Sequence, residues 1–101
     1  MPGDSLLVEG RPLEEFVRRI VAEVLVVAPE EVRPGAALIR DLGAESIDFM
    51  DLVFRLEEAL ATRIPYTRWQ QFLQETLAGR DPTVAITPET VEEFARRESP
   101  S

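Results

Sequence analysis

The chain has 101 residues, of which 45% are hydrophobic and 30% are charged, and its formal net charge is −8. It contains no cysteine, no histidine and no lysine, so it has no disulfide, no thiolate, no imidazole base and no amine for a Schiff base. Most enzyme classes built on a side-chain nucleophile are thereby excluded, and the length fits one small domain. An acidic chain repels nucleic acid and anionic membranes, so we expect partners with basic patches.

The N-terminal residues 1–11 have no clear hydrophobic period, and we expect them to be flexible. They show no signal-peptide pattern, and no apolar run in the chain could span a bilayer, which indicates a cytoplasmic protein. A first helix is predicted to start near Pro12. Its core-facing residues recur at helical spacing: Leu13, Phe16, Val17, Ile20, Val24 and Val27.

A long connection follows, from Ala28 to Ala44. Its prolines block a continuous helix, and a short turn is expected at residues 30–32. Spaced apolar residues are predicted to pin the connection across the bundle: Val32, Leu38, Ile39 and Leu42. Gly43 suits a tight turn because glycine adopts backbone angles that other residues resist.

A second helix, from about Ser46 to Ala61, organises the rest of the chain. Its apolar residues have helical spacing and predict one core stripe: Ile47, Met50, Leu52, Val53, Phe54, Leu56 and Leu60. Met50 and Phe54 are expected at the rim of this stripe if Val53 and Leu56 point to the core. Acidic residues between them predict one solvated face: Asp48, Asp51, Glu57 and Glu58. Ser46 stands at the helix start, and taken alone it is most simply explained as a helix cap that contributes roughly 1 kcal/mol.

The segment Leu42-Gly43-Ala44-Glu45-Ser46-Ile47-Asp48 resembles the attachment motif of acyl carrier proteins, in which a serine carries 4'-phosphopantetheine. The likeness extends from Phe16 to Pro65. It implies that Ser46 is the attachment site, that 4'-phosphopantetheine from coenzyme A is the covalent cofactor, and that the protein is not itself an enzyme. The physics agrees, because a phosphodiester at a helix N-terminus meets free N–H groups and the positive end of the helix dipole.

Two departures from that family stand out. Glu45 occupies the position before the serine where the family usually has aspartate, which leaves the cognate transferase open. The stretch after Pro65 is longer than in the common fatty-acid carriers and contains Trp69. Together with Asp48-Phe49-Met50-Asp51 and Ile64-Pro65, this tryptophan resembles the pattern of specialised carriers of very long acyl chains.

The acidic face of the second helix has two interpretations. A solvated surface is the ordinary one. The resemblance instead implies a docking surface for a phosphopantetheinyl transferase and for acyl-chain synthases, reductases or acyltransferases, made by Glu45, Asp48, Met50, Asp51, Phe54, Glu57 and Glu58. Reversing Asp48 and Asp51 to lysine is predicted to weaken transfer while the fold survives. Arg55 adds a positive charge to this face and is expected to adjust partner choice.

Two further helices are predicted. Thr67 and Gln70 have the spacing of a capping box, which places a third helix over about residues 68–78. A polar linker with Pro82 covers residues 80–86. Thr87 as N-cap, followed by Pro88, starts a fourth helix that ends near residue 97. Residues 98–101 are expected to be flexible.

An acyl pocket is predicted between the second and third helices from helical phase and the resemblance. Its residues are Phe49, Val53, Leu56, Ile64 and Trp69. Trp69 has a competing interpretation as an ordinary core residue, since large aromatic side chains dominate core energetics.

The sequence thus predicts a single all-α domain over residues 1–101, a monomeric four-helix bundle of acyl-carrier type with a long loop between the first two helices and an extended third helix. Its predicted function is to carry acyl intermediates as thioesters for fatty-acid or specialised lipid biosynthesis, and the chain ends favour a discrete carrier. A polyketide or peptidyl carrier domain is the nearest alternative, although Ala44 argues mildly against the peptidyl type. An unmodified acidic interaction module is the alternative from another class. The acyl cargo and the pathway stay open.

Overall fold

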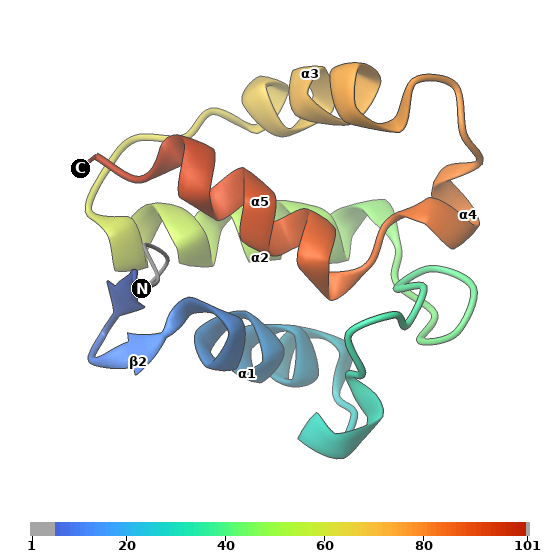
Figure 1. Cartoon of the computed structure of the whole chain (residues 1–101), viewed down its shortest axis with the longest axis horizontal. Coiled ribbons are helices and arrows are strands. Elements are labelled where there is room, and N and C mark those ends of the chain that lie inside the picture. The colour runs from blue at the N-terminus through green and yellow to red at the C-terminus, as the bar shows by residue number, and fades with distance from the viewer. Residues whose placement is uncertain (1–5, 101) are drawn as a thin grey trace.

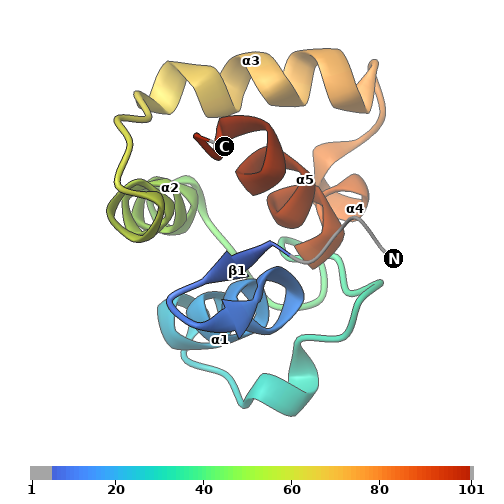
Figure 2. The ribbon, with the colours of Figure 1, turned by 60° about the vertical axis from the view of Figure 1, so that its left-hand side comes forward.

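The structure is a computed structural model that describes residues 6–100. Its helices are α1 (Leu13–Leu25), α2 (Ser46–Leu60), α3 (Tyr66–Leu77), α4 (Pro82–Ala85) and α5 (Pro88–Glu98), with a 3-10 turn η1 (Pro29–Glu31). The prediction of an all-α domain is therefore confirmed. Helix α5 lies between α1 and α3, and α2 packs along one side of the group (Figures 1 and 2).

One hydrophobic core joins these helices. Its largest fully buried side chains include Phe94 of α5, Leu52 and Leu56 of α2, and Leu38 of the long connection. Burying one such side chain contributes about 1.5–3 kcal/mol relative to leaving it in water. Four of the six core residues predicted for the first helix are buried in α1, and Val24 is half-buried there. Val27, which is also half-buried, lies two residues beyond the end of α1.

The N-terminal segment departs from the prediction. Residues expected to be loose form an antiparallel hairpin of β1 (Leu7–Val8) and β2 (Arg11–Pro12), and only 2% of Val8 is exposed. The two turn residues, Glu9 and Gly10, have φ of 54° and 80°, the left-handed conformation that two-residue hairpin loops require. Residues 1–5 and 101, for which flexibility was also predicted, lie outside the described residues.

Helix α3 starts earlier than predicted, so the capping box of Thr67 and Gln70 is wrong. The N-cap is Pro65, which has an extended conformation and no side-chain acceptor. Its carbonyl accepts the N–H of Arg68 at 2.9 Å. Thr67 therefore already lies inside the first turn, where its hydroxyl cannot act as an N-cap.

The predicted linker at residues 80–86 contains a helix of its own, so the described residues form five helices rather than four. The carboxylate of Asp81 accepts the N–H of Thr83 at 3.0 Å and thereby caps α4. A four-residue helix is too short to show a hydrophobic period, which is why the pattern predicts only a linker. Helix α5 then begins after Thr87, its predicted N-cap.

Candidate functional site

Ser46 is the first residue of α2 and is exposed to solvent. The N-cap is Glu45, so the interpretation of Ser46 as the helix cap is wrong. Within residues 6–100 the Ser46 hydroxyl has no hydrogen-bond partner, and the N–H groups of Ser46 and Ile47 have no acceptor. The start of α2 is instead closed by Asp48, whose carboxylate accepts the N–H of Glu45 at 2.8 Å.

The loop before Ser46 is held by its own backbone. Gly43 has a φ of 76°, the left-handed turn predicted for it, and its N–H donates to the carbonyl of Ile39 at 3.0 Å. The next residue, Ala44, donates its N–H to the carbonyl of Leu38 at 2.9 Å. Ser46 therefore follows an ordered turn that ends two residues before it.

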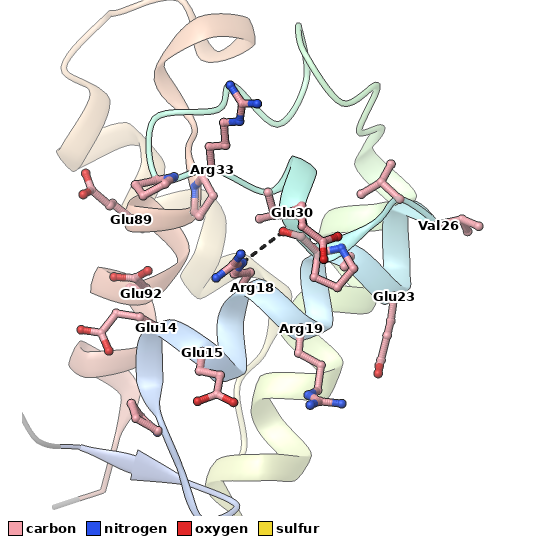
Figure 3. Close-up of a pocket in the computed structure, with 17 residues that line it drawn as sticks. Glu14, Glu15, Arg18, Arg19, Glu23, Val26, Glu30, Arg33, Glu89 and Glu92 are labelled. Carbon is pink, nitrogen blue, oxygen red and sulfur yellow. Dashed lines mark hydrogen bonds between the residues drawn. The ribbon is translucent and has the colours of Figure 1, made fainter.

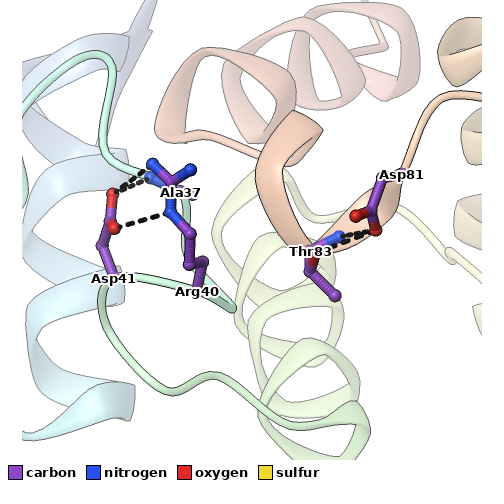
Figure 4. A network of polar contacts seen from close by, with 5 residues as sticks. All are labelled: Ala37, Arg40, Asp41, Asp81 and Thr83. Atoms are coloured by element: carbon purple, nitrogen blue, oxygen red, sulfur yellow. Dashed lines mark hydrogen bonds and ion pairs between the residues drawn. The ribbon is translucent and has the colours of Figure 1, made fainter.

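Asp41 closes the other side of this loop (Figure 4). Its carboxylate accepts the N–H of Ala37 at 2.9 Å and pairs with the guanidinium of Arg40 at 3.0 Å. The hydrogen bond from Arg40 and that from Ala37 hold the pKa of the Asp41 carboxyl below its usual range. Asp41 is thus ionised at neutral pH, the state in which it accepts both bonds.

Helix α2 exposes a second apolar stripe. Ile47, Met50 and Phe54 are 68%, 52% and 55% exposed. The exposure of Met50 and Phe54 agrees with their predicted place at the rim of the helix, but the assignment of Ile47 to the core stripe is wrong. These three residues have the spacing i, i+3 and i+7, so they share one face, while the residues that point into the core lie on another.

The carboxylates of α2 fall into two groups. Asp48 is engaged at the helix start, and Asp51 pairs with Arg55 at 3.2 Å. Arg55 also reaches α1, where it pairs with Glu23 at 2.7 Å. The two remaining acidic side chains of α2, those of Glu57 and Glu58, have no ion pair or hydrogen bond within the described part of the chain.

The five predicted pocket residues are all buried in the common core. Trp69, at 2% exposure, stacks on Phe49 with ring centroids 5.7 Å apart and on Phe72 with centroids 5.9 Å apart. Its ring also meets the edge of Phe94 on α5 at 5.1 Å. The core interpretation of Trp69 is therefore confirmed, and aromatic rings occupy the interior between α2, α3 and α5. The role of these residues as an acyl pocket stays a prediction.

A broad groove of about 1170 Å³ lies elsewhere, across α1, η1 and the start of α5 (Figure 3). Glu14, Glu89 and Glu92 gather at its α1–α5 side, and Arg18 donates to the carbonyl of Pro29 at 3.0 Å. Burial and the nearby Glu14 raise the pKa of the Glu92 carboxyl. The sequence did not predict this groove because it joins helices that are distant in the chain, and no residue of α2 lines it.

Residues 6–100 contain neither a membrane-spanning helix nor a group of metal-ligating side chains. No helix there has the length and apolar character needed to cross a membrane. No group of acidic side chains there has the arrangement of a metal site.

These features define a class of protein: a small helical domain that presents one serine at the start of a long helix, beside a face of mixed apolar and acidic residues. The family model for the phosphopantetheine attachment site matches residues 15–69, more than half of the chain. The chain belongs to this family, and its cofactor is covalently attached 4'-phosphopantetheine. Domains of this family act as carriers and are generally non-catalytic. The matched segment contains Ser46 and ends inside α3, before α4 and α5.

Proposed function

We propose that Ser46 is the attachment residue. The observation that supports this most directly is an exposed serine hydroxyl with no hydrogen-bond partner among residues 6–100, at the first position of a fifteen-residue helix. The unpaired N–H groups of Ser46 and Ile47 suit the oxygens of a phosphodiester, and the helix dipole favours the same charge. By contrast, Ser99 is half-buried at the end of α5.

The cargo we propose is an acyl group held as a thioester, in fatty-acid or specialised lipid biosynthesis. The phosphopantetheine supplies the thiol, which a chain without cysteine needs from outside. The buried apolar residues at the α2–α3 side support an aliphatic cargo, which would contact Phe49, Val53, Leu56, Ile64 and Trp69. A polyketide or peptidyl carrier is the nearest alternative.

The proposed docking surface for partner enzymes is the exposed face of α2. Its apolar part is Ile47, Met50 and Phe54, and its charged part is Glu45, Asp48, Asp51, Glu57 and Glu58. A partner that fits has a basic patch around an apolar recess, as a phosphopantetheinyl transferase, a synthase, a reductase or an acyltransferase could provide. Electrostatic steering makes such encounters fast and sensitive to salt, which suits a carrier that must bind and leave repeatedly.

The intact mass of the protein tests the attachment residue. After incubation with coenzyme A and a broad-specificity phosphopantetheinyl transferase, the wild type and Ser99→Ala are expected to gain one phosphopantetheine, and Ser46→Ala none. A gain that persists in Ser46→Ala would refute the assignment. No gain in the wild type, even after Glu45→Asp restores the usual family residue, would favour an unmodified interaction module.

Fluorescence of the single tryptophan tests the cargo. Loading the modified protein with acyl chains of increasing length is expected to shift the Trp69 emission once the chain reaches the aromatic rings. An acetyl group is the matched control, because it is too short to reach the core. An emission spectrum that stays constant for all chain lengths would argue against the pocket.

A further inference from the structure

We propose that Asp81 is a positioning residue for the modification of Ser46, because it caps α4 and α4 holds the loop that leads to the serine. This inference rests on the proposed function, since it takes Ser46 as the attachment residue. Asp81 has no hydrogen bond or ion pair with Ser46 or with residues 37–45, so it acts through α4.

Asp81 is the N-cap of α4. A helix of four residues has no stability of its own, because forming the first turn costs more than its single hydrogen bond returns. The Asp81 carboxylate accepts the N–H of Thr83 at 3.0 Å and the Thr83 hydroxyl at 2.8 Å (Figure 4). The Asp81 carbonyl accepts the N–H groups of Val84 and Ala85. Asp81 thus supplies the acceptors for the whole first turn of α4.

Two backbone hydrogen bonds join α4 to the loop that precedes Ser46. The carbonyl of Thr83 accepts the N–H of Arg40 at 3.1 Å, and the carbonyl of Ile86, at the C-cap of α4, accepts the N–H of Leu38 at 2.9 Å. Leu38 and Ile86 are also fully buried in the core. These two hydrogen bonds keep their places only while α4 keeps its turn.

Leu38 connects α4 to the residues just before the serine. Leu38 donates its N–H to Ile86, and its carbonyl accepts the N–H of Ala44, two residues before Ser46. Loss of the α4 turn therefore loosens the backbone at Leu38 and, through the Leu38 carbonyl, at Ala44. Asp41 still holds Ala37 from the opposite side, so the loop gains freedom without the domain unfolding.

The consequence concerns the transferase reaction. The transferase binds the serine productively only in the fraction of molecules whose loop is ordered, and an apparent binding constant weakens in proportion to that fraction. Replacing an aspartate cap with alanine shifts a helix equilibrium by about 2- to 30-fold, while asparagine caps as well as aspartate. We therefore expect alanine at position 81 to weaken the cap and asparagine to preserve it, although both replacements remove the negative charge.

The test compares the full-length apo proteins of the wild type, Asp81→Ala and Asp81→Asn. For Asp81→Ala we expect kcat/KM of phosphopantetheine transfer to fall by about 3- to 10-fold, mainly through KM, and hydrogen exchange at the amides of Leu38 and Arg40 to accelerate. Asp81→Asn is expected to stay within about twofold of the wild type in both measurements. The amide of Leu56 in α2 is the internal control and should keep its protection.

Three outcomes would overturn the inference. Asp81→Ala could behave like the wild type, or the Leu56 amide could lose its protection. Asp81→Asn could also lose as much activity as Asp81→Ala, which would mean that the transferase recognises the charge of Asp81. If Asp81→Ala fails to fold, Thr83→Val removes only the hydroxyl bond and should reproduce the effect at smaller size. Failure of the proposed function would look different: Ser46→Ala would still be modified, or the wild type would not be, while the exchange rates at Leu38 and Arg40 would still report on the cap.

Discussion

Charge reversal on α2 should have two distinct effects, which the pair Asp48→Lys and Glu58→Lys separates. Asp48 closes the start of the helix through the N–H of Glu45, whereas Glu58 is exposed and has no partner within residues 6–100. Both carboxylates belong to the proposed docking surface. We therefore expect both variants to slow transfer, and only Asp48→Lys to lose stability.

The size of the stability loss follows from the contact. Removing a capping acceptor costs about 0.5–2 kcal/mol, and placing a positive charge in the first helical turn loses a dipole interaction of about 0.3–1 kcal/mol. Asp48→Lys should thus lower the free energy of unfolding by about 1–3 kcal/mol. Each kcal/mol shifts Tm by about 4–8 °C in a domain of this size, so the expected decrease is about 4–24 °C. Glu58→Lys should stay within about 0.5 kcal/mol of the wild type.

Thermal unfolding followed by circular dichroism measures the first effect, and the salt dependence of transferase kcat/KM measures the second. The loss caused by Glu58→Lys should shrink as salt rises, because the Debye length falls from about 10 Å at 0.1 M to about 3 Å at 1 M. Equal Tm values for the two variants would refute the capping role of Asp48. Unchanged transfer by Glu58→Lys at low salt would refute the docking role of this face.

Two further substitutions test the core and the groove. Trp69→Ala is expected to lower the free energy of unfolding by about 3–5 kcal/mol in urea titrations, since it removes a ring stacked on Phe49. Trp69→Phe keeps an aromatic ring and should lower the free energy of unfolding far less. Equal losses in the two variants would contradict the stacking argument. Glu92→Gln is expected to stabilise the protein at neutral pH by about 0.5 kcal/mol. Burial and Glu14 raise the pKa of Glu92, so the folded state holds this proton more tightly than the unfolded state does, and the gain should vanish as pH falls through the raised pKa. Destabilisation by Glu92→Gln at neutral pH would contradict this sign.

The features that the sequence predicts well are those with a repeated physical signature. Helices α1 and α2 each carry several turns of apolar residues, and both begin within one residue and end within two residues of the predicted positions. Gly43 has the left-handed φ that its residue type favours, and Thr87 precedes α5 as its composition indicates. In each case the local preference and the tertiary packing favour the same conformation, so neither overrides the other.

The features that the sequence does not predict depend on single contacts or on distant segments. Glu9 adopts a positive φ because the hairpin requires it, and glutamate has no intrinsic preference for this conformation that the sequence could reveal. Helix α4 is only four residues long, and the carboxylate of Asp81 caps its start. Helical spacing alone places Ile47 in the core stripe, but the residue is exposed. An apolar residue at the edge of a helical stripe can be assigned to the core or to the surface only when the positions of the neighbouring helices are known.

Helix α2 has one apolar face in the core and a second apolar face in water, and the second face is informative about function. A helix that needed only to fold would have no reason to keep Ile47, Met50 and Phe54 in water, since their burial elsewhere is worth about 1.5–3 kcal/mol each. Contiguous exposed apolar residues on a small protein usually mark a binding surface. The net charge of −8 offsets the risk of self-association, because two copies repel before their apolar faces meet. A basic partner would experience the opposite force, so the same charge that keeps copies apart would favour its approach to the proposed docking surface beside Ser46.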